Sequence, residues 1–491
     1  MKSATCWTLV LLAIELASWR IAQSKVLGAE PTYDSEAPIC KLIVYPAPEP
    51  RPALRYQLLP PMADRRPGNA AVLYNKTFAE QTAFLNEFGK GGLWEKIEKW
   101  LEVPLGDPRE KELRKPWESA SAMFRGGGMF DNLDRAARCE SCDWQLPIRE
   151  QEFYAILLPE LQQTRDYARL LATKARLEIA EGKFDDALRT LQTGYGLARH
   201  VGQGQTLIHG LVGAAESAMM SKRVEDWVQR PGSPNLYWAL TWLPRPLIDF
   251  RPGLETELSM IYLSYPDLRN LESARYSAEQ WREILEKTVD RVLRWSDGRV
   301  PIPRSLISTA AALRAYPMAK RALIARGRPA AEVEAMPVPQ VIMIYTMRTY
   351  EELRDDLFKW FAVPYPEGRA GAAEAEQALK RAAHEGREAL PMASLLLPAI
   401  QSARFAEVRQ DRTIAMLRIV EALRLYGAAH KKRLPDELAE IKEVPIPLDP
   451  VTGKTFLYQH TSGTAILESP PIPGKPQKDF GVRYEIQFAR P

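Results

Sequence analysis

The chain has 491 residues, 46% of them hydrophobic and 26% charged, and this composition excludes an intrinsically disordered protein. At roughly 150 residues per domain, the length indicates about two to four domains with sizeable cores. The 66 lysines and arginines nearly balance the 62 aspartates and glutamates, and the net charge of +4 argues against nucleic-acid binding.

The first residues have the layout of a secretory signal peptide. A lysine precedes an apolar run from about Ala4 to Trp19, and small residues follow at Ala22 and Ser24. The run contains Glu15 and is shorter than the ~20 apolar residues that span a bilayer, so a retained membrane anchor is the less favoured alternative. We predict cleavage of residues 1–24 and an exported protein, in the periplasm, the cell envelope or the medium, without stable membrane insertion.

Residues 25–77 are expected to form a proline-rich extended arm. Prolines occur at Pro31, Pro38, Pro46, Pro48, Pro50, Pro52, Pro60, Pro61 and Pro67. Such a density is incompatible with a continuous helix or a central strand. Within the arm, the sequence KLIVY at 41–45 predicts one short edge strand.

A helical body is predicted over residues 78–367, in one or two subdomains. Apolar residues recur at three- and four-residue steps from Phe153 to Ile179, which predicts a long amphipathic helix. Gly182 ends this helix, and the same spacing resumes from Phe184 to Ala198, so a helical hairpin is expected. Similar patterns predict helices over 92–104, 207–228, 278–295, 304–325 and 341–361.

The hairpin sequence resembles one tetratricopeptide repeat. Gly182, Phe184, Ala187 and Leu191 fall where that family places its turn glycine, its aromatic residue and its small packing residues. No second copy follows at the family's repeat length, so an irregular tetratricopeptide-like body is expected instead of a regular array. The resemblance implies a concave surface that binds proteins or peptides.

The chain is expected to end in a small α+β module over residues 395–491, after a charged, alanine-rich connector over 368–394. A dense helical pattern covers about Arg404 to His430, and alternation at Val482, Tyr484, Ile486 and Phe488 predicts a strand after two shorter apolar runs. The predicted fold class is therefore mainly α, with irregular stacked helical hairpins and a small C-terminal α+β module.

The segment from about Leu395 to Glu468 resembles the globular part of type II secretion pseudopilins. The likeness rests on LLLPAIQSAR, the helix that follows it, PLDPVTGKTFLY and a short hairpin. The family's amino-terminal membrane helix does not precede this segment. Exported bacterial proteins of unassigned activity resemble the whole arrangement of signal, helical body and tail. Neither resemblance assigns catalytic residues.

Cys139 and Cys142 are the clearest chemical candidates. Two thiols three residues apart suit a local disulfide, a metal ion or a redox pair. A zinc site would need further ligands, and Cys40, His200 and His209 are available without any spacing that selects them. We favour a disulfide or two packed thiols, because an exported protein meets an oxidising compartment, and we expect no bound metal or other cofactor.

No sequence motif of a known catalytic site occurs. The glycines at 126–128 lack the remainder of a phosphate-binding loop, and the histidines show no HExxH spacing. His209 and Glu216 lie seven residues apart on one predicted helix face and could serve as a base and its orienting group. Packed polar groups at a helix contact are the favoured interpretation.

Tyr237, Trp238 and Trp242 form an aromatic cluster that could line a face for a peptide or a sugar. Aromatic residues at helical spacing more often belong to a core, and we favour that role here. The amphipathic run at 92–104 is likewise expected to pack on the helical body.

The sequence is best interpreted as a non-catalytic, exported helical scaffold of the cell envelope that binds a protein or peptide partner. One alternative is an envelope metal-binding or hydrolytic enzyme that uses Cys139 and Cys142 or the helix of His209. Another is an accessory element of a secretion or surface-filament system, which the tail alone supports.

Overall fold

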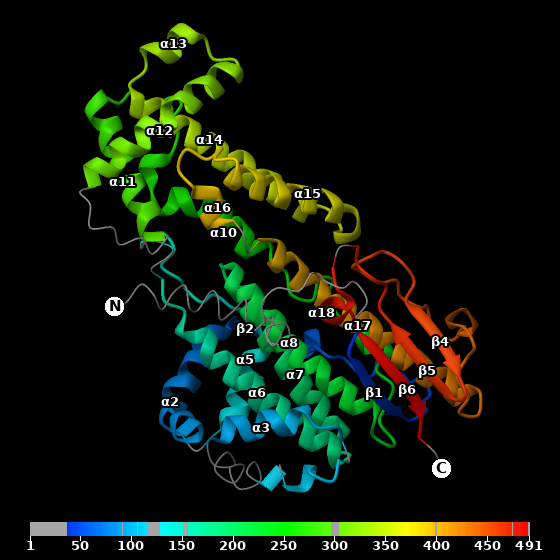
Figure 1. Cartoon of the computed structure of the whole chain (residues 1–491). Helices are drawn as coiled ribbons and strands as arrows, with labels where there is room; N and C mark the ends of the chain where they lie inside the picture. Colours follow the sequence, from blue (N-terminus) through cyan, green and yellow to red (C-terminus); the bar gives the residue numbers. More distant parts are fainter. Residues whose placement is uncertain are drawn as a thin grey trace. The chain divides into compact units, whose positions relative to one another are not determined.

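The structure, a computed structural model, describes residues 37–90, 92–105, 107–112, 114–115, 128–150, 153, 156–295, 304–397, 400–473 and 475–489 (Figure 1). The expected signal peptide lies outside the described residues. The chain is mainly helical with a small strand-containing region at its carboxyl end, which confirms the predicted fold class.

The chain divides into two compact units. Unit 1 contains the described residues of 146–157 and 254–405, and unit 2 contains those of 12–145, 158–253 and 406–491. Unit 2 therefore takes its residues from both sides of the segment that forms most of unit 1.

The helices of unit 2 centre on three that contact one another, α6, α7 and α8. They are α2 (Ala70–Lys90), α3 (Leu93–Glu102), α5 (Met129–Ala137), α6 (Pro159–Ala180), α7 (Phe184–Gly202), α8 (Leu207–Val228) and α9 (Tyr237–Thr241). Helices α6 and α7 confirm the predicted hairpin, and the bounds of α8 match the predicted helix at 207–228.

Glycines set the turn and the closest helix contact of this three-helix group. Gly182 follows α6 with φ 72°, a left-handed conformation that costs glycine little. At Gly213 of α8, an added Cβ would lie 2.6 Å from the Ala198 carbonyl oxygen and 2.8 Å from the Gly202 Cα, both on α7. The α7 and α8 backbones can approach this closely only because residue 213 has no side chain.

A four-stranded sheet lies at the carboxyl end of unit 2 and takes its first strand from the amino-terminal part of the chain (Figure 1). The order is β1 (Ile39–Val44), β6 (Arg483–Phe488), β5 (Thr464–Glu468) and β4 (Leu457–Thr461), with β1 parallel to β6 and the other pairs antiparallel. The short edge strand predicted at 41–45 is thus confirmed at the edge of this sheet.

One face of the sheet shares a core with α17 (Ile400–Ala429). In β1, Leu42 and Val44 are buried while Ile43 is 55% exposed, as expected for alternating strand residues. Met416, Ile419, Val420 and Leu423 of α17 are fully buried in the same core cluster as Leu467, Tyr484 and Ile486 of the sheet.

A buried ion pair joins α17 to the loop before β4. Both oxygens of Asp449 accept hydrogen bonds from the Arg412 guanidinium, at 2.8 Å from Nε and 2.7 Å from Nη2, and neither side chain is exposed. Asp449 also accepts hydrogen bonds from the backbone N–H of Val451 and from the hydroxyl of Thr452. This one carboxylate therefore fixes the turn in the PLDPVTG segment.

Unit 1 is a group of helices in which α14 (Val338–Phe358) contacts α11, α12, α15 and α16. Most of α10 (Arg251–Ser264) belongs to this unit, because unit 1 resumes at Leu254. The elements that follow are η4 (Pro266–Leu268), α11 (Ala278–Trp295), α12 (Arg304–Ala325), α13 (Ala330–Ala335), η5 (Lys359–Ala362), α15 (Tyr365–His384) and α16 (Met392–Leu396). The predicted helices at 278–295, 304–325 and 341–361 correspond to α11, α12 and α14.

Several boundaries differ from those expected. The alanine-rich connector is largely helix α15, whose Ala372, Ala375, Leu379 and Ala382 are buried at three- and four-residue steps. The proline-rich arm ends sooner, because α2 already begins at Ala70, and it includes η2 (Met62–Asp64) and β2 (Arg66–Asn69). Strand β2 pairs with β3 (Cys139–Ser141), which the sequence did not predict. A short α18 (Gln477–Phe480) precedes β6.

Candidate binding groove

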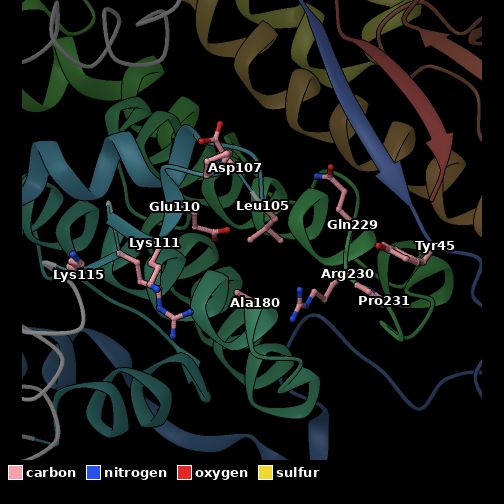
Figure 2. A pocket seen from close by; sticks show the side chains of 12 residues that line it. Tyr45, Leu105, Asp107, Glu110, Lys111, Lys115, Ala180, Gln229, Arg230 and Pro231 are labelled. Atoms are coloured by element: carbon pink, nitrogen blue, oxygen red, sulfur yellow. The ribbon is translucent and has the colours of Figure 1, made fainter. Parts of the chain in front are cut away.

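An open groove of about 780 Å³ lies in unit 2. It lies where several segments of unit 2 meet: the residues after β1, the segment after α3, the end of α6 and the end of α8 (Figure 2). Its lining consists of Tyr45, Leu105, Asp107, Pro108, Glu110, Lys111, Arg114, Lys115, Ala180, Gln229, Arg230 and Pro231. The volume is within the ~300–1,000 Å³ of typical ligand sites.

Two buried arginines position the segment that enters the groove after α3. Arg176 of α6 donates from Nη2 to the Val103 carbonyl oxygen at 2.5 Å, and Arg223 of α8 donates from Nη2 to the Leu101 carbonyl oxygen at 3.0 Å. Both arginines form ion pairs with Asp226, at 3.2 and 2.9 Å. These contacts hold the end of α3 against α6 and α8. The groove wall is therefore fixed by buried ion pairs and hydrogen bonds.

Burial shapes the ionisation of this network. Asp226 is 4% exposed, and its burial raises the pKa of the carboxyl group while the neighbouring Arg223 and Arg176 lower it. The Arg176 guanidinium also lies over the Trp100 ring at 5.5 Å from the ring centre. The buried charges of this wall are therefore paired and its side chains are packed, so the wall is ordered before a ligand binds.

The ends of α6 and α8 reach the groove with their carbonyl groups already bonded. The N–H groups of Glu181, Gly182 and Lys183 donate to the last turn of α6, and the latter two bonds close the turn at Gly182. At the end of α8, Tyr45 donates its N–H to the Val228 carbonyl oxygen at 3.4 Å, and Arg230 donates its N–H to Trp227 at 3.1 Å. The cationic side chains of the lining are not required to satisfy these carbonyl groups.

Cys139 and Cys142 lie away from this groove, beside His200. Cys139, Cys142 and Cys40 are free thiols in the structure. Cys139 is the first residue of strand β3 (Cys139–Ser141), and Cys142 directly follows this strand. Burial raises the pKa of both the Cys139 and the Cys142 thiol, which disfavours the reactive thiolate.

His200 and Cys40, two of the further ligands considered, have other partners. The His200 Nε2–H donates to the Cys139 carbonyl oxygen at 3.1 Å, and Nδ1 accepts from the Tyr74 hydroxyl at 3.0 Å. Burial lowers the pKa of His200 to about 4, so the ring is neutral. The thiol of Cys40, on β1, contacts Glu225 and Lys222 of α8 at 3.5 and 3.6 Å, and burial raises its pKa to about 11.

His209 and Glu216 are both fully buried on α8, but no hydrogen bond or ion pair joins them. His209 Nδ1 lies 2.7 Å from the Thr206 hydroxyl, and Nε2 lies 3.5 Å from a Glu160 carboxyl oxygen. Neither Glu216 oxygen forms a hydrogen bond with the described residues. Burial raises the pKa of Glu216 to about 8, against the opposing effects of Thr164 and Arg165.

The three aromatic candidates have different surroundings. Tyr237 is fully buried in the core of α17 and the sheet, where Arg418 donates to its hydroxyl at 3.1 Å. Trp238 is partly buried and donates to Glu49 at 2.6 Å, whereas Trp242 is 68% exposed. The three side chains therefore do not form one continuous face.

Sequence reasoning did not find the groove. The charged run at 107–115 has the pattern of an ordinary solvated surface, and the other lining residues come from distant parts of the chain. Within the described ranges, no group of three or more His, Cys, Asp and Glu side chains could hold a metal ion. None of the described helices is long and apolar enough to cross a membrane. No protein-family model, curated protein or solved structure matches the chain.

Proposed function

We propose that this chain is a non-catalytic, exported interaction protein that binds a segment of a partner protein in the groove of unit 2. The observation that carries the proposal is the position of the groove, an open hollow of about 780 Å³ at the ends of packed helices. Ligand sites commonly occur between helices of such bundles.

The frame around the groove supports binding of an extended segment. Arg176 and Arg223 hold the end of α3 to two long helices through buried hydrogen bonds, so the wall needs little ordering when a ligand enters. A site that is ordered before binding loses less entropy on association. The lining combines apolar and charged side chains, which suits a peptide with both kinds of residue.

Site-specific photocrosslinking tests this proposal. A benzophenone amino acid replaces Ala180, which lines the groove, or Ala79, an exposed alanine of α2 that serves as the matched control. Irradiation in the cells that produce the protein is expected to give a crosslinked protein of defined mass from position 180 only. The crosslinked partner is then identified by mass spectrometry, purified and tested for binding to the unmodified chain.

Two results would contradict the proposal. One is the same set of crosslinked products from both positions, which indicates random collision. The other is a purified partner that binds equally well to a chain in which Tyr45→Ala and Leu105→Ala remove two apolar side chains of the lining.

A further inference from the structure

We infer that the groove selects an acidic, extended segment of its partner. This inference rests on the proposed function and adds the chemical class of the ligand. It is carried by three cationic side chains of the lining, those of Lys111, Lys115 and Arg230.

These three cations have no acidic partner within the part of the chain that the structure describes. Lys111 and Lys115 are exposed, and Arg230 is half-buried beside the end of α8. No ion pair with an aspartate or glutamate joins any of the three, although many other lysines and arginines of the chain are paired. Figure 2 shows the Lys111 and Arg230 side chains on opposite sides of the groove.

The acids of the lining are already neutralised by arginines. Asp107 accepts two hydrogen bonds from the Arg109 side chain, both at 2.9 Å, and this pairing lowers the pKa of Asp107 to about 2. Glu110 lies 3.5 Å from the buried Arg176 guanidinium. The remaining lining cation, Arg114, pairs with Glu181 at 2.6 Å. Among the described residues that line the groove, Lys111, Lys115 and Arg230 are therefore the cations without an acidic partner.

The helix ends do not account for these cations. Cations are commonly placed at helix C-termini because the last carbonyl groups carry partial negative charge. Here the Asp226, Trp227 and Val228 carbonyl groups of α8 accept backbone N–H groups, and the Glu225 carbonyl group accepts the Gln229 side chain. An anionic ligand is the partner of opposite charge that this arrangement can take.

The apolar part of the lining distinguishes a peptide from a nucleic acid. The lining also contains Tyr45, Leu105, Ala180, Pro108 and Pro231, and Figure 2 shows Ala180 between Lys111 and Arg230. Single-stranded nucleic acid is bound by series of aromatic rings along a basic track. One aromatic ring and short aliphatic side chains fit better with carboxylates that alternate with apolar residues.

Fluorescence anisotropy with the full chain tests the inference. The probes are a labelled short peptide in which Asp and Glu alternate with Leu and Phe, its Asn/Gln counterpart, and a single-stranded DNA of equal length. The groove variant is Lys111→Gln, Lys115→Gln, Arg230→Gln. The matched control is Lys432→Gln, Arg433→Gln, Lys442→Gln, which removes the same charge from exposed positions elsewhere in unit 2.

The acidic peptide is expected to bind the unmodified chain and the control equally, and the groove variant at least about tenfold more weakly. Added salt is expected to weaken the binding, because exposed charges are screened. Thermal melting of both variants verifies that they are folded.

Three results would overturn the inference: an amide peptide that binds as well as the acidic one, equal losses in the groove variant and the control, or groove-dependent binding of DNA that exceeds binding of the peptide. If one of these occurs while position 180 still crosslinks a specific protein, the charge preference is wrong and the proposed function remains. If position 180 also gives no specific crosslink, both fail.

Discussion

Glu216 is a carboxylic acid in the interior of α8, and its environment links the stability of the protein to pH. The side chain is 0% exposed and its pKa is raised from 4.5 to about 8 by burial. Between these pH values the folded chain keeps a proton that the unfolded chain has released. The stabilisation is therefore fully present below pH 4.5 and is lost as the pH rises from 4.5 to about 8, above which the loss is complete.

The substitution Glu216→Gln is expected to remove this pH dependence, because an amide is neutral throughout. At roughly 1.4 kcal/mol for each unit of difference in pKa, the wild-type side chain accounts for a loss of about 5 kcal/mol from the free energy of unfolding between pH 4.5 and 8. Urea unfolding at pH 5, 7 and 9 measures the free energy of unfolding of the wild type and of the variant. Glu140→Gln, at an exposed position, is the control, and parallel pH curves for the wild type and Glu216→Gln would contradict the argument.

Asp449 is expected to be essential for the tail, because its removal leaves the Arg412 guanidinium buried without a counterion. Breaking a buried pair from one side costs about 3–5 kcal/mol, and Asp449→Ala should lower the free energy of unfolding of unit 2 by that amount. The double variant Arg412→Met, Asp449→Leu should recover part of the loss, because no charge remains buried. Equal instability of the single and double variants in urea unfolding would instead assign the effect to the turn at Thr452.

At the scale of elements, the contact between α7 and α8 depends on Gly213. Gly213→Ala is expected to destabilise unit 2 by about 1–3 kcal/mol, because the new methyl group meets backbone atoms of α7 that cannot rotate away. Gly89→Ala in α2 is the matched control, since its Cβ would lie 3.5 Å from Trp94, an ordinary contact. That control should be neutral or gain up to about 1 kcal/mol from helix propensity. Similar thermal melting of the two variants would show that the helices can separate without cost.

The spacing of apolar residues along the chain was sufficient to predict most helices. It could not predict the contacts between segments that are distant in the sequence. The periodicity that predicted 207–228, 278–295 and 304–325 depends only on neighbours along the chain, and α8, α11 and α12 have these bounds. The edge strand at 41–45 was also predictable, but its parallel pairing with β6 was not, because the two strands lie at opposite ends of the sequence.

The same limit applies to the groove. Which cations remain uncompensated depends on the acids that are near in space: Arg114 finds Glu181, while Lys111 in the same run finds none in the described part of the chain. A charged run in the sequence cannot separate these two cases. His209 and Glu216 show the converse, because their shared helix face was predictable but their separate partners were not.

At the scale of the whole molecule, two compact units with separate cores are expected to unfold in separate transitions. One substitution in each unit can assign them. Gly371→Ala lies in unit 1, where an added Cβ would be 2.1 Å from the Trp360 ring, and Asp449→Ala lies in unit 2. Differential scanning calorimetry of the full chain should show that each variant lowers the melting temperature of a different transition. A single transition that both variants lower would mean that the units unfold as one cooperative structure.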